Sequence, residues 1–460
     1  MFLNMTAKWA VRGGRKTMAI VNAGAARTLS AHPADHTNYS AMAMVTTLFF
    51  AWGFCTVLND AVIPHLQSVF DLSYVQASLI QLAFFSSYFV FALPAGKLVE
   101  WIGYQRTMVV GLVLMASGAL LFVPAASVAT YAFFLCAEVV LAAGVTVLQV
   151  AANPYVTILG PPETASSRLN LTQAFNTLGD SVAPYIGGVL ILGGAAAALP
   201  TGEHLQGAAL TAYRIQQAAS IKLPFIAIAS AATVLALAVA LYRFPRIAVT
   251  REFRPADLSV KQEHVWNHPH LYLGAIGIFI YVGAEVSIGS YMVKYFADPK
   301  IAGLPLERAA KLVTFYWFGM MVGRFIGSAA MQRIAANKML AWSGLGAGLL
   351  VLASLLGTGY FAVVTILAVG LFNSIMFPTI FTLAVAELGP LTGRGSGLLV
   401  QAIVGGAVFP VFMGFLADKF GIHRSLLMPL LCYLYVIYYG WRGYRIRPTE
   451  PQTHLQALAE

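Results

Sequence analysis

Long apolar runs recur along the chain, separated by short polar segments, and within the runs polar and apolar residues do not alternate. A helix needs about 20 apolar residues to cross the hydrocarbon layer of a bilayer, which is roughly 30 Å thick. Windows of this length fall near residues 41–62, 77–98, 107–126, 130–152, 170–194, 222–243, 270–292, 311–331, 339–357, 360–386, 396–417 and 425–441. A transmembrane barrel would instead need alternating segments of about ten residues. The pattern therefore predicts an all-α membrane protein with twelve transmembrane helices.

The composition agrees with this prediction, since 59% of the residues are hydrophobic, only 10% are charged and the mean hydropathy is +0.74. A water-soluble globule of 460 residues could not bury so much apolar surface. The three cysteines, Cys55, Cys136 and Cys432, lie in apolar segments without paired spacing. They indicate neither a disulfide framework nor a metal site, and we expect them to fill the core.

The basic residues predict an orientation in the membrane. If the N-terminus is cytoplasmic, most of the 28 lysine and arginine residues fall on the cytoplasmic side, as the positive-inside rule requires. We therefore expect both termini to be cytoplasmic. The formal net charge of +10 then reflects topology and contact with the lipid bilayer, and we expect no binding to nucleic acid.

A weak internal repeat divides the spans into two groups of six. Arg168 is followed by a proline and then by a glycine, and in the second half of the chain Arg394 is followed by the same two residue types at the same spacing. Such repeats are typical of transporters built from two bundles around a central site. The predicted organisation is a disordered cytoplasmic tail (1–40), an N-terminal six-helix bundle (41–243), a cytoplasmic linker (244–269), a pseudo-symmetric C-terminal six-helix bundle (270–441) and a cytoplasmic tail (442–460).

Polar side chains within the spans are the candidate functional residues, because a charge at bilayer depth is costly unless it faces a cavity or a partner. In the first span, "WGFCTVLNDAVIP" contains Trp52, Asn59 and Asp60, with no lysine or arginine nearby to neutralise the acid. We interpret Asp60 as a carboxylate that takes up and releases a proton. The alternative is that it lies hydrated at the outer mouth of its span.

Amides follow in the fourth and fifth spans. Gln149 and Asn153 are four residues apart and so share one face of a helix, which Pro154 should kink. In the fifth span, "RLNLTQAFNTLGD" forms one polar stripe from Gln173, Asn176, Thr177 and Asp180. The stripe predicts contact with a hydrated chamber. Two amides in the fourth span suit a hydroxylated ligand, and the alternative is hydrogen bonding between helices.

The later spans add three isolated polar residues, Glu285, Asn373 and Gln401, each of which suits packing as well as ligand contact. Amides, acids and aromatic rings such as Trp52 favour a neutral polyhydroxylated solute, because an anionic substrate would need an interior cation. We expect Arg324 to lie near a cytoplasmic helix end and not to serve that purpose. The residues predict a sugar site midway across the membrane.

Four segments together resemble the fucose/glucose/galactose permease family of the major facilitator superfamily: "WGFCTVLND", "LQVAANPYVTILG", "RLNLTQAFN" and "YVGAEVSIGS". The last of these is more similar to the glucose/galactose branch. The resemblance implies a cation-coupled sugar importer, working by alternating access, in a bacterial inner membrane. It also implies that Asp60 is the titrating acid of the first span, and that Trp52 and Asn176 contact the sugar.

One position departs from the family pattern. A second acid of the fourth span is replaced here by Gln149, which cannot titrate. Asp180, on the polar stripe, and Glu138, on the face of Gln149, are candidate replacements, and the alternative is that Asp60 alone couples one cation. Neutral oxygens beside Asp60 would also suit Na⁺, although we favour H⁺.

The remaining expectations concern the substrate and what is absent. We place glucose and galactose first, then N-acetylglucosamine, then fucose, and keep a non-coupled sugar facilitator or a sugar sensor as alternatives. The sequence contains no nucleophile and base pair, no phosphate-binding glycine loop and no histidine cluster, so we expect no enzyme, no cofactor and no metal. We expect a monomer.

Overall fold

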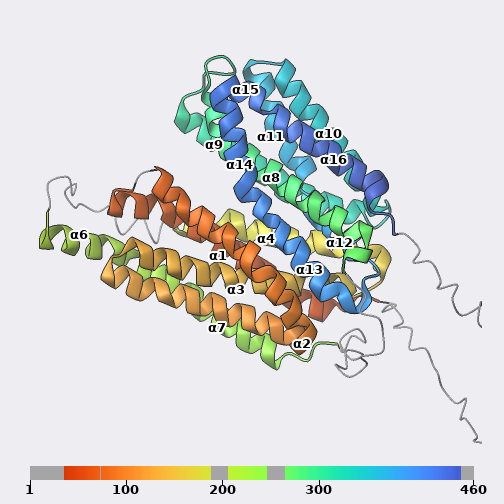
Figure 1. The fold of residues 1–460 in the computed structure, drawn as a ribbon, viewed down its shortest axis with the longest axis horizontal. Coiled ribbons are helices and arrows are strands. Elements are labelled where there is room, and N and C mark those ends of the chain that lie inside the picture. The colour runs from red at the N-terminus through yellow and green to blue at the C-terminus, as the bar shows by residue number, and fades with distance from the viewer. Residues whose placement is uncertain (1–35, 73, 188–205, 246–264, 447–460) are drawn as a thin grey trace, which may run out of the picture. The chain divides into compact units, whose positions relative to one another are not determined.

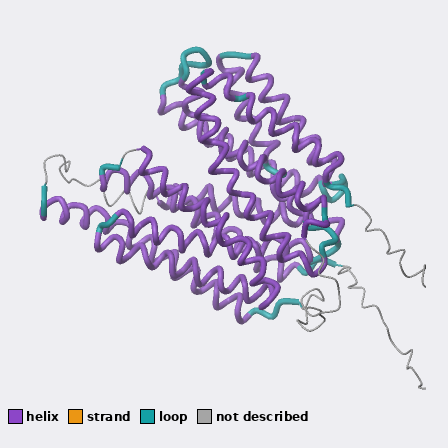
Figure 2. Tube along the Cα trace, viewed as in Figure 1, coloured by secondary structure: helices purple, strands orange, loops and turns teal. Residues whose placement is uncertain are grey.

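The computed structural model describes residues 36–72, 74–187, 206–245 and 265–446, and these residues form helices and connecting loops without a strand (Figure 2). The first half of the described chain comprises α1 (Tyr39–Phe70), α2 (Tyr74–Val128), α3 (Tyr131–Ile158), α4 (Ala165–Gly187), α6 (Ala208–Ala218) and α7 (Lys222–Leu241). The second half comprises α8 (Pro269–Ala297), α9 (Leu306–Ala330), α10 (Ala336–Leu356), α11 (Gly359–Asn373), α12 (Met376–Ala384), α13 (Thr392–Gln401), α14 (Gly405–Phe420), α15 (Ile422–Ser425) and α16 (Leu427–Tyr438). Most of each predicted tail and of the linker lies outside the described residues.

Eight stretches of the described chain are long and apolar enough to cross a membrane. The longest is Leu79–Val128, at 50 residues, and it covers two of the predicted spans. The two are separated at Gly103, whose φ of 82° and ψ of 169° lie outside the helical region. Glycine adopts this positive φ without the steric penalty that a side chain would bring.

The tenth span is interrupted. Its helix ends at Asn373 and resumes at Met376, shortly before Pro378. Proline has no N–H, so Pro378 cannot donate to the carbonyl of Ser374 four residues earlier. The break leaves backbone carbonyl groups in the interior that other side chains can bind.

Hydrogen bonds join the two halves where α4 begins and where α9 and α12 end. The hydroxyl groups of Ser166 and Thr382 lie 2.5 Å apart, and the Ser167 hydroxyl donates to the carbonyl of Ser328 at 2.7 Å. The Ser328 hydroxyl returns a hydrogen bond to the Ser167 carbonyl at 2.8 Å. We call the end of the bundle defined by these four residues the closed end.

Glycines allow a further contact between the halves at this end. The carbonyl oxygen of Ala92, in α2, would lie 2.7 Å from a Cβ added at Gly397, in α13. Gly96 and Gly393 approach each other in the same way. Figure 1 shows α13 beside α2, and the absence of side chains at these positions lets the two backbones touch.

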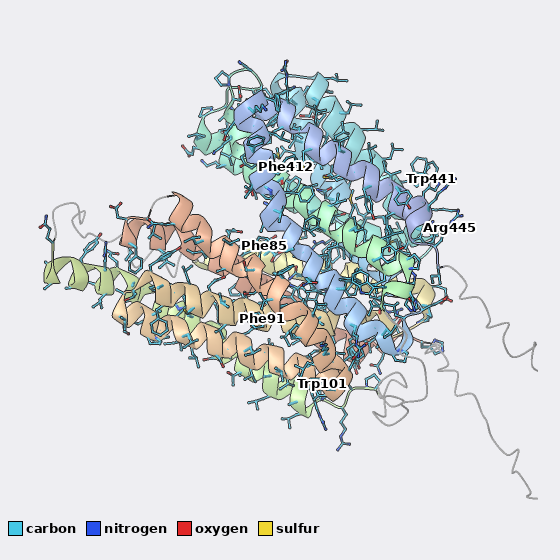
Figure 3. The ribbon with its side chains drawn as sticks, in the orientation of Figure 1. Phe85, Phe91, Trp101, Phe412, Trp441 and Arg445 are labelled. Atoms are coloured by element: carbon cyan, nitrogen blue, oxygen red, sulfur yellow. The ribbon has the colours of Figure 1, made fainter. Side chains whose placement is uncertain are left out.

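The surface carries the residues that a membrane protein needs. Large apolar side chains are exposed along the helices, and Trp101 and Trp441 are 73% and 69% exposed near helix ends (Figure 3). Tryptophan is enriched at the boundary between lipid and water, where its ring is apolar and its N–H is wet. These two residues are therefore placed as interface anchors.

Candidate functional site

The polar stripe of α4 faces α1. The Asn176 amide donates to the carbonyl of Phe49 at 2.9 Å. A Cβ added at Gly53 would lie 2.5 Å from Nδ2 of Asn176 and 2.7 Å from Oδ1 of Asp180. Trp52 is buried, and its ring centroid lies 4.3 Å from that of Phe49. The structure thus places Asn176 and Asp180 against α1 at Gly53, the residue that follows Trp52.

The amides of α3 lie deeper. Gln149 is buried and donates from Nε2 to the Tyr88 hydroxyl at 2.7 Å, so it joins α3 to α2. Asn153 is fully buried, and its amide atoms have no hydrogen-bond partner among the described residues. The helix continues through Pro154 to Ile158. Glu138 is also buried, at 1% exposed.

Two predicted residues of the first span cannot be placed. Asn59 and Asp60 belong to α1, but their side chains lie outside the described residues. Gln173 is buried on α4. Gln401 donates from Nε2 to the carbonyl of Phe89 at 2.9 Å, which is another contact between the halves.

The second half contains a buried polar cluster around Asn373. Its side-chain amide donates to the Tyr316 hydroxyl at 2.8 Å, and its backbone carbonyl accepts from the Tyr281 hydroxyl at 2.7 Å. Glu285 lies one helical turn along α8 from Tyr281. The tyrosines were not predicted from the sequence, although the four-residue spacing between Tyr281 and Glu285 places both on one face.

Arg324 is buried, with 8% exposure, in the last part of α9 and one helical turn before Ser328 of the closed end. Nε donates to the Ser374 carbonyl at 3.2 Å, which is the carbonyl left free by Pro378. Nη1 donates to the Gln173 carbonyl at 2.8 Å and to the hydroxyl of Thr177. The break in the tenth span thus supplies Arg324 with a backbone acceptor that the sequence did not predict. Through its other hydrogen bonds Arg324 links the second half to α4.

These residues supply groups with which a neutral, hydroxylated molecule could exchange hydrogen bonds. Amide groups and an indole ring are present, and the described hydrogen-bond acceptors around Arg324 occupy its Nε and Nη1 donors. An anion would require donors that the protein does not already use. That the named polar residues line one hydrated chamber stays a prediction.

Known proteins share the sequence and the fold of this chain. The sequence model of the Major Facilitator Superfamily matches residues 42–403. A glucose/galactose transporter of Brucella abortus biovar 1 (strain 9-941) is 51% identical over 407 residues, which cover 88% of this chain and 95% of that protein. The L-fucose-proton symporter of Escherichia coli (strain K12) is 33% identical over 86% of this chain and 92% of its own length. The crystal structure of FucP, a major facilitator transporter in the outward conformation, matches with a TM-score of 0.79 and 33% identity over 88% of this chain and 98% of that one.

Proposed function

Because the chain belongs to the Major Facilitator Superfamily, we propose that it is a symporter that imports a neutral hexose, glucose or galactose first, together with a proton. Family membership confirms the predicted twelve-helix fold in two six-helix bundles, and the prediction that the protein is a membrane transporter and not an enzyme. One observation carries the proposed substrate: 51% identity, along nearly the whole chain, to a protein named a glucose/galactose transporter.

We assign the substrate site to polar and aromatic residues of both halves. Hydroxyl groups of a sugar can exchange hydrogen bonds with amides, and its apolar ring face can stack on an indole. The proposed substrate-binding residues are Trp52, Asn59, Gln149, Asn153, Gln173, Asn176, Glu285, Asn373 and Gln401. The proposed coupling residues are Asp60 and a second acid, either Asp180 or Glu138. The second acid would take the role of the fourth-span acid of the family pattern, whose position is occupied here by Gln149.

The contacts between the halves support transport by alternating access. Hydrogen bonds of Ser166 and Ser167 hold the two halves together at the closed end. We propose that this end faces the cytoplasm of a bacterium, with both termini on that side, and that the arrangement is open to the outside. Sugar and proton would then bind from outside and leave after the closed end separates.

Uptake into proteoliposomes tests the proposal. With labelled glucose as the probe, we expect counterflow, competition by galactose, and uphill accumulation when a pH gradient is imposed. Accumulation driven only by a Na⁺ gradient would show that the coupling ion is Na⁺ and not H⁺. Counterflow without accumulation under either gradient would indicate a facilitator. If N-acetylglucosamine or fucose competed more strongly than galactose, that sugar would be assigned as the substrate instead. Binding without counterflow would indicate a sensor, and neither binding nor counterflow with any of these sugars would refute the proposed function.

A single substitution distinguishes Asp180 from the other candidate coupling residues. Asp180→Asn removes a titratable group beside Asn176 and Gly53 but preserves its shape. If Asp180 carries a proton, this variant should retain counterflow and lose uphill accumulation. Unchanged accumulation would eliminate Asp180 and leave Asp60 and Glu138 as the candidates.

A further inference from the structure

Two buried carbonyl groups lose their usual hydrogen-bond donor to a proline. Pro154 lies within α3, and Pro378 lies near the start of α12. A proline has no N–H, so it cannot donate to the carbonyl of the residue four positions earlier. The residues concerned are Val150 and Ser374, and both are buried. Each carbonyl therefore needs a donor from elsewhere in the protein.

The carbonyl of Val150 accepts its hydrogen bond from the opposite half. The Ser396 hydroxyl, on α13, donates to it at 2.7 Å. Both residues are 0% exposed. Ser396 directly precedes Gly397, whose backbone lies against α2 at the closed end. The bond therefore belongs to the region where the two halves meet.

The carbonyl of Ser374 is bound by a side chain that also reaches the opposite half. Nε of Arg324 donates to this carbonyl at 3.2 Å. Nη1 of Arg324 donates to the Gln173 carbonyl at 2.8 Å and to the Thr177 hydroxyl, both on α4. The guanidinium is planar and holds its donors in a fixed arrangement, which suits such a double contact. One side chain thus connects the freed carbonyl of the second half to the first half.

The two arrangements are equivalent in the repeat. Pro154 lies in the fourth span and Pro378 in the tenth, which is the fourth span of the second half. In each half this span supplies a carbonyl without a partner in its own helix. In each case the donor makes that carbonyl part of a contact between the halves.

We propose that these two carbonyls are docking points that keep the closed end closed, and that Ser396 and Arg324 are positioning residues of the transport cycle. The proposal rests on the alternating access of the proposed function. When the halves separate, the bonds from Ser396 to α3 and from Arg324 to α4 break, while Arg324 keeps its bond to Ser374 within the second half. Water that enters the opened end then donates to the carbonyl of Val150 in place of Ser396.

The proline makes the bond of Ser396 specific for the closed state. In a regular helix the carbonyl of Val150 would have a partner in its own helix in every state, and Ser396 would add little. Because Pro154 removes that partner, loss of the serine hydroxyl leaves a buried acceptor unpaired in the closed state, which is costly. In the open state water satisfies the carbonyl. A change at Ser396 should therefore shift the equilibrium toward the open state.

Maleimide labelling of a cysteine at the closed end tests the proposal without any sugar. The cysteine replaces Ser328, which is buried at that end, in a protein whose own three cysteines are replaced by alanine. A second protein carries its cysteine at Ser87 instead, which is 2% exposed and donates to the carbonyl of Val139 within the first half. Opening of the closed end exposes the first cysteine and not the second, whereas loss of folding exposes both.

The first variant is Ser396→Ala. It should increase the labelling rate at Ser328 by about 5-fold to 150-fold, since labelling proceeds through the open state, and leave the rate at Ser87 unchanged. Ser425→Ala is the matched control. Ser425 is 1% exposed and its hydroxyl also donates at 2.7 Å, but to a carbonyl within α15. This control should change neither rate.

Pro154→Ala tests the freed carbonyl itself. The alanine restores an N–H that can donate to the carbonyl of Val150, so loss of the Ser396 hydroxyl no longer leaves that carbonyl unpaired. In the Pro154→Ala background the effect of Ser396→Ala on labelling should be smaller by at least about threefold. An equal effect in both backgrounds would overturn the claim that the proline creates the docking point.

Arg324→Lys is an independent variant that decides the proposal even if Ser396→Ala fails to insert into the membrane. Lysine keeps the positive charge but has a single nitrogen, which cannot reproduce the planar contact with Ser374 and α4 together. Labelling at Ser328 should again be faster, and labelling at Ser87 unchanged.

Two results would overturn the proposal as a whole. One is labelling at Ser328 that is as slow in Ser396→Ala and Arg324→Lys as in the unchanged protein. The other is equal acceleration at Ser328 and Ser87, because general loss of packing would then explain it. Failure of the proposed function is a separate outcome, since it would appear as absent sugar transport and would leave the labelling results as predicted.

Discussion

Gly397→Ala should push the two halves apart at the closed end. The added Cβ would lie 2.7 Å from the carbonyl oxygen of Ala92, whereas ordinary contacts begin at 3.4 Å. The obstructing atom belongs to the backbone of α2, so it cannot turn aside as a flexible side chain would. Overpacking of this kind costs about 1 to 3 kcal/mol, and only the state in which α2 and α13 touch bears the cost. The equilibrium should therefore shift toward opening by about 5-fold to 150-fold.

The assay is the rate at which a maleimide labels a cysteine placed at Ser328, which is buried at the closed end. Gly397→Ala should increase that rate by the same factor, if labelling proceeds through the open state. Gly348→Ala is the matched control, because its Cβ would meet its nearest neighbours, Leu430 and Tyr433, at 3.7 Å within the second half. Equal labelling rates in the two variants would refute the view that the contact between Gly397 and Ala92 breaks during transport.

Three further substitutions have defined outcomes. Arg394→Gln breaks the ion pair with Glu100, whose atoms lie 2.8 Å apart; because the Arg394 side chain is 44% exposed, we expect a loss of about 1 kcal/mol in the closed state, seen as faster labelling at the closed end that depends less on salt than in the unchanged protein. Gln149→Leu removes the hydrogen bond to Tyr88 and should lower the free energy of unfolding by about 1 to 3 kcal/mol, measured by thermal unfolding in detergent. Gly53→Ala places a Cβ within 2.7 Å of polar atoms of α4 and should abolish counterflow while the protein still inserts, as fractionated membranes would show.

The spans could be predicted from the sequence because their length is fixed by the bilayer and not by other parts of the chain. The window at 311–331 matches α9 (Leu306–Ala330) and the window at 339–357 matches α10 (Ala336–Leu356). The window at 222–243 missed the preceding helix, Ala208–Ala218, because its polar residues lower the hydropathy. Local patterns thus located the helices, but the predicted bounds differ from the observed ones by several residues.

The partners of the polar residues were harder to predict. Helical spacing correctly placed Asn176 and Asp180 on one face, but the acceptor for Asn176 is a backbone carbonyl on α1, which no sequence pattern reveals. The interior position of Arg324 depends on a carbonyl freed by Pro378, which belongs to a different span. Such contacts depend on how helices pack, so the sequence identifies the candidates and the structure supplies their partners.

The central claim is that sugar and proton cross together through these spans. The most direct measurement records both at once, with labelled glucose and a pH-sensitive dye in the same proteoliposomes and no membrane potential imposed. Our account predicts that adding glucose makes the outer medium more alkaline as the sugar enters, in a fixed ratio of protons to sugar. Entry of glucose with no change in external pH, whatever the cation present, would contradict it.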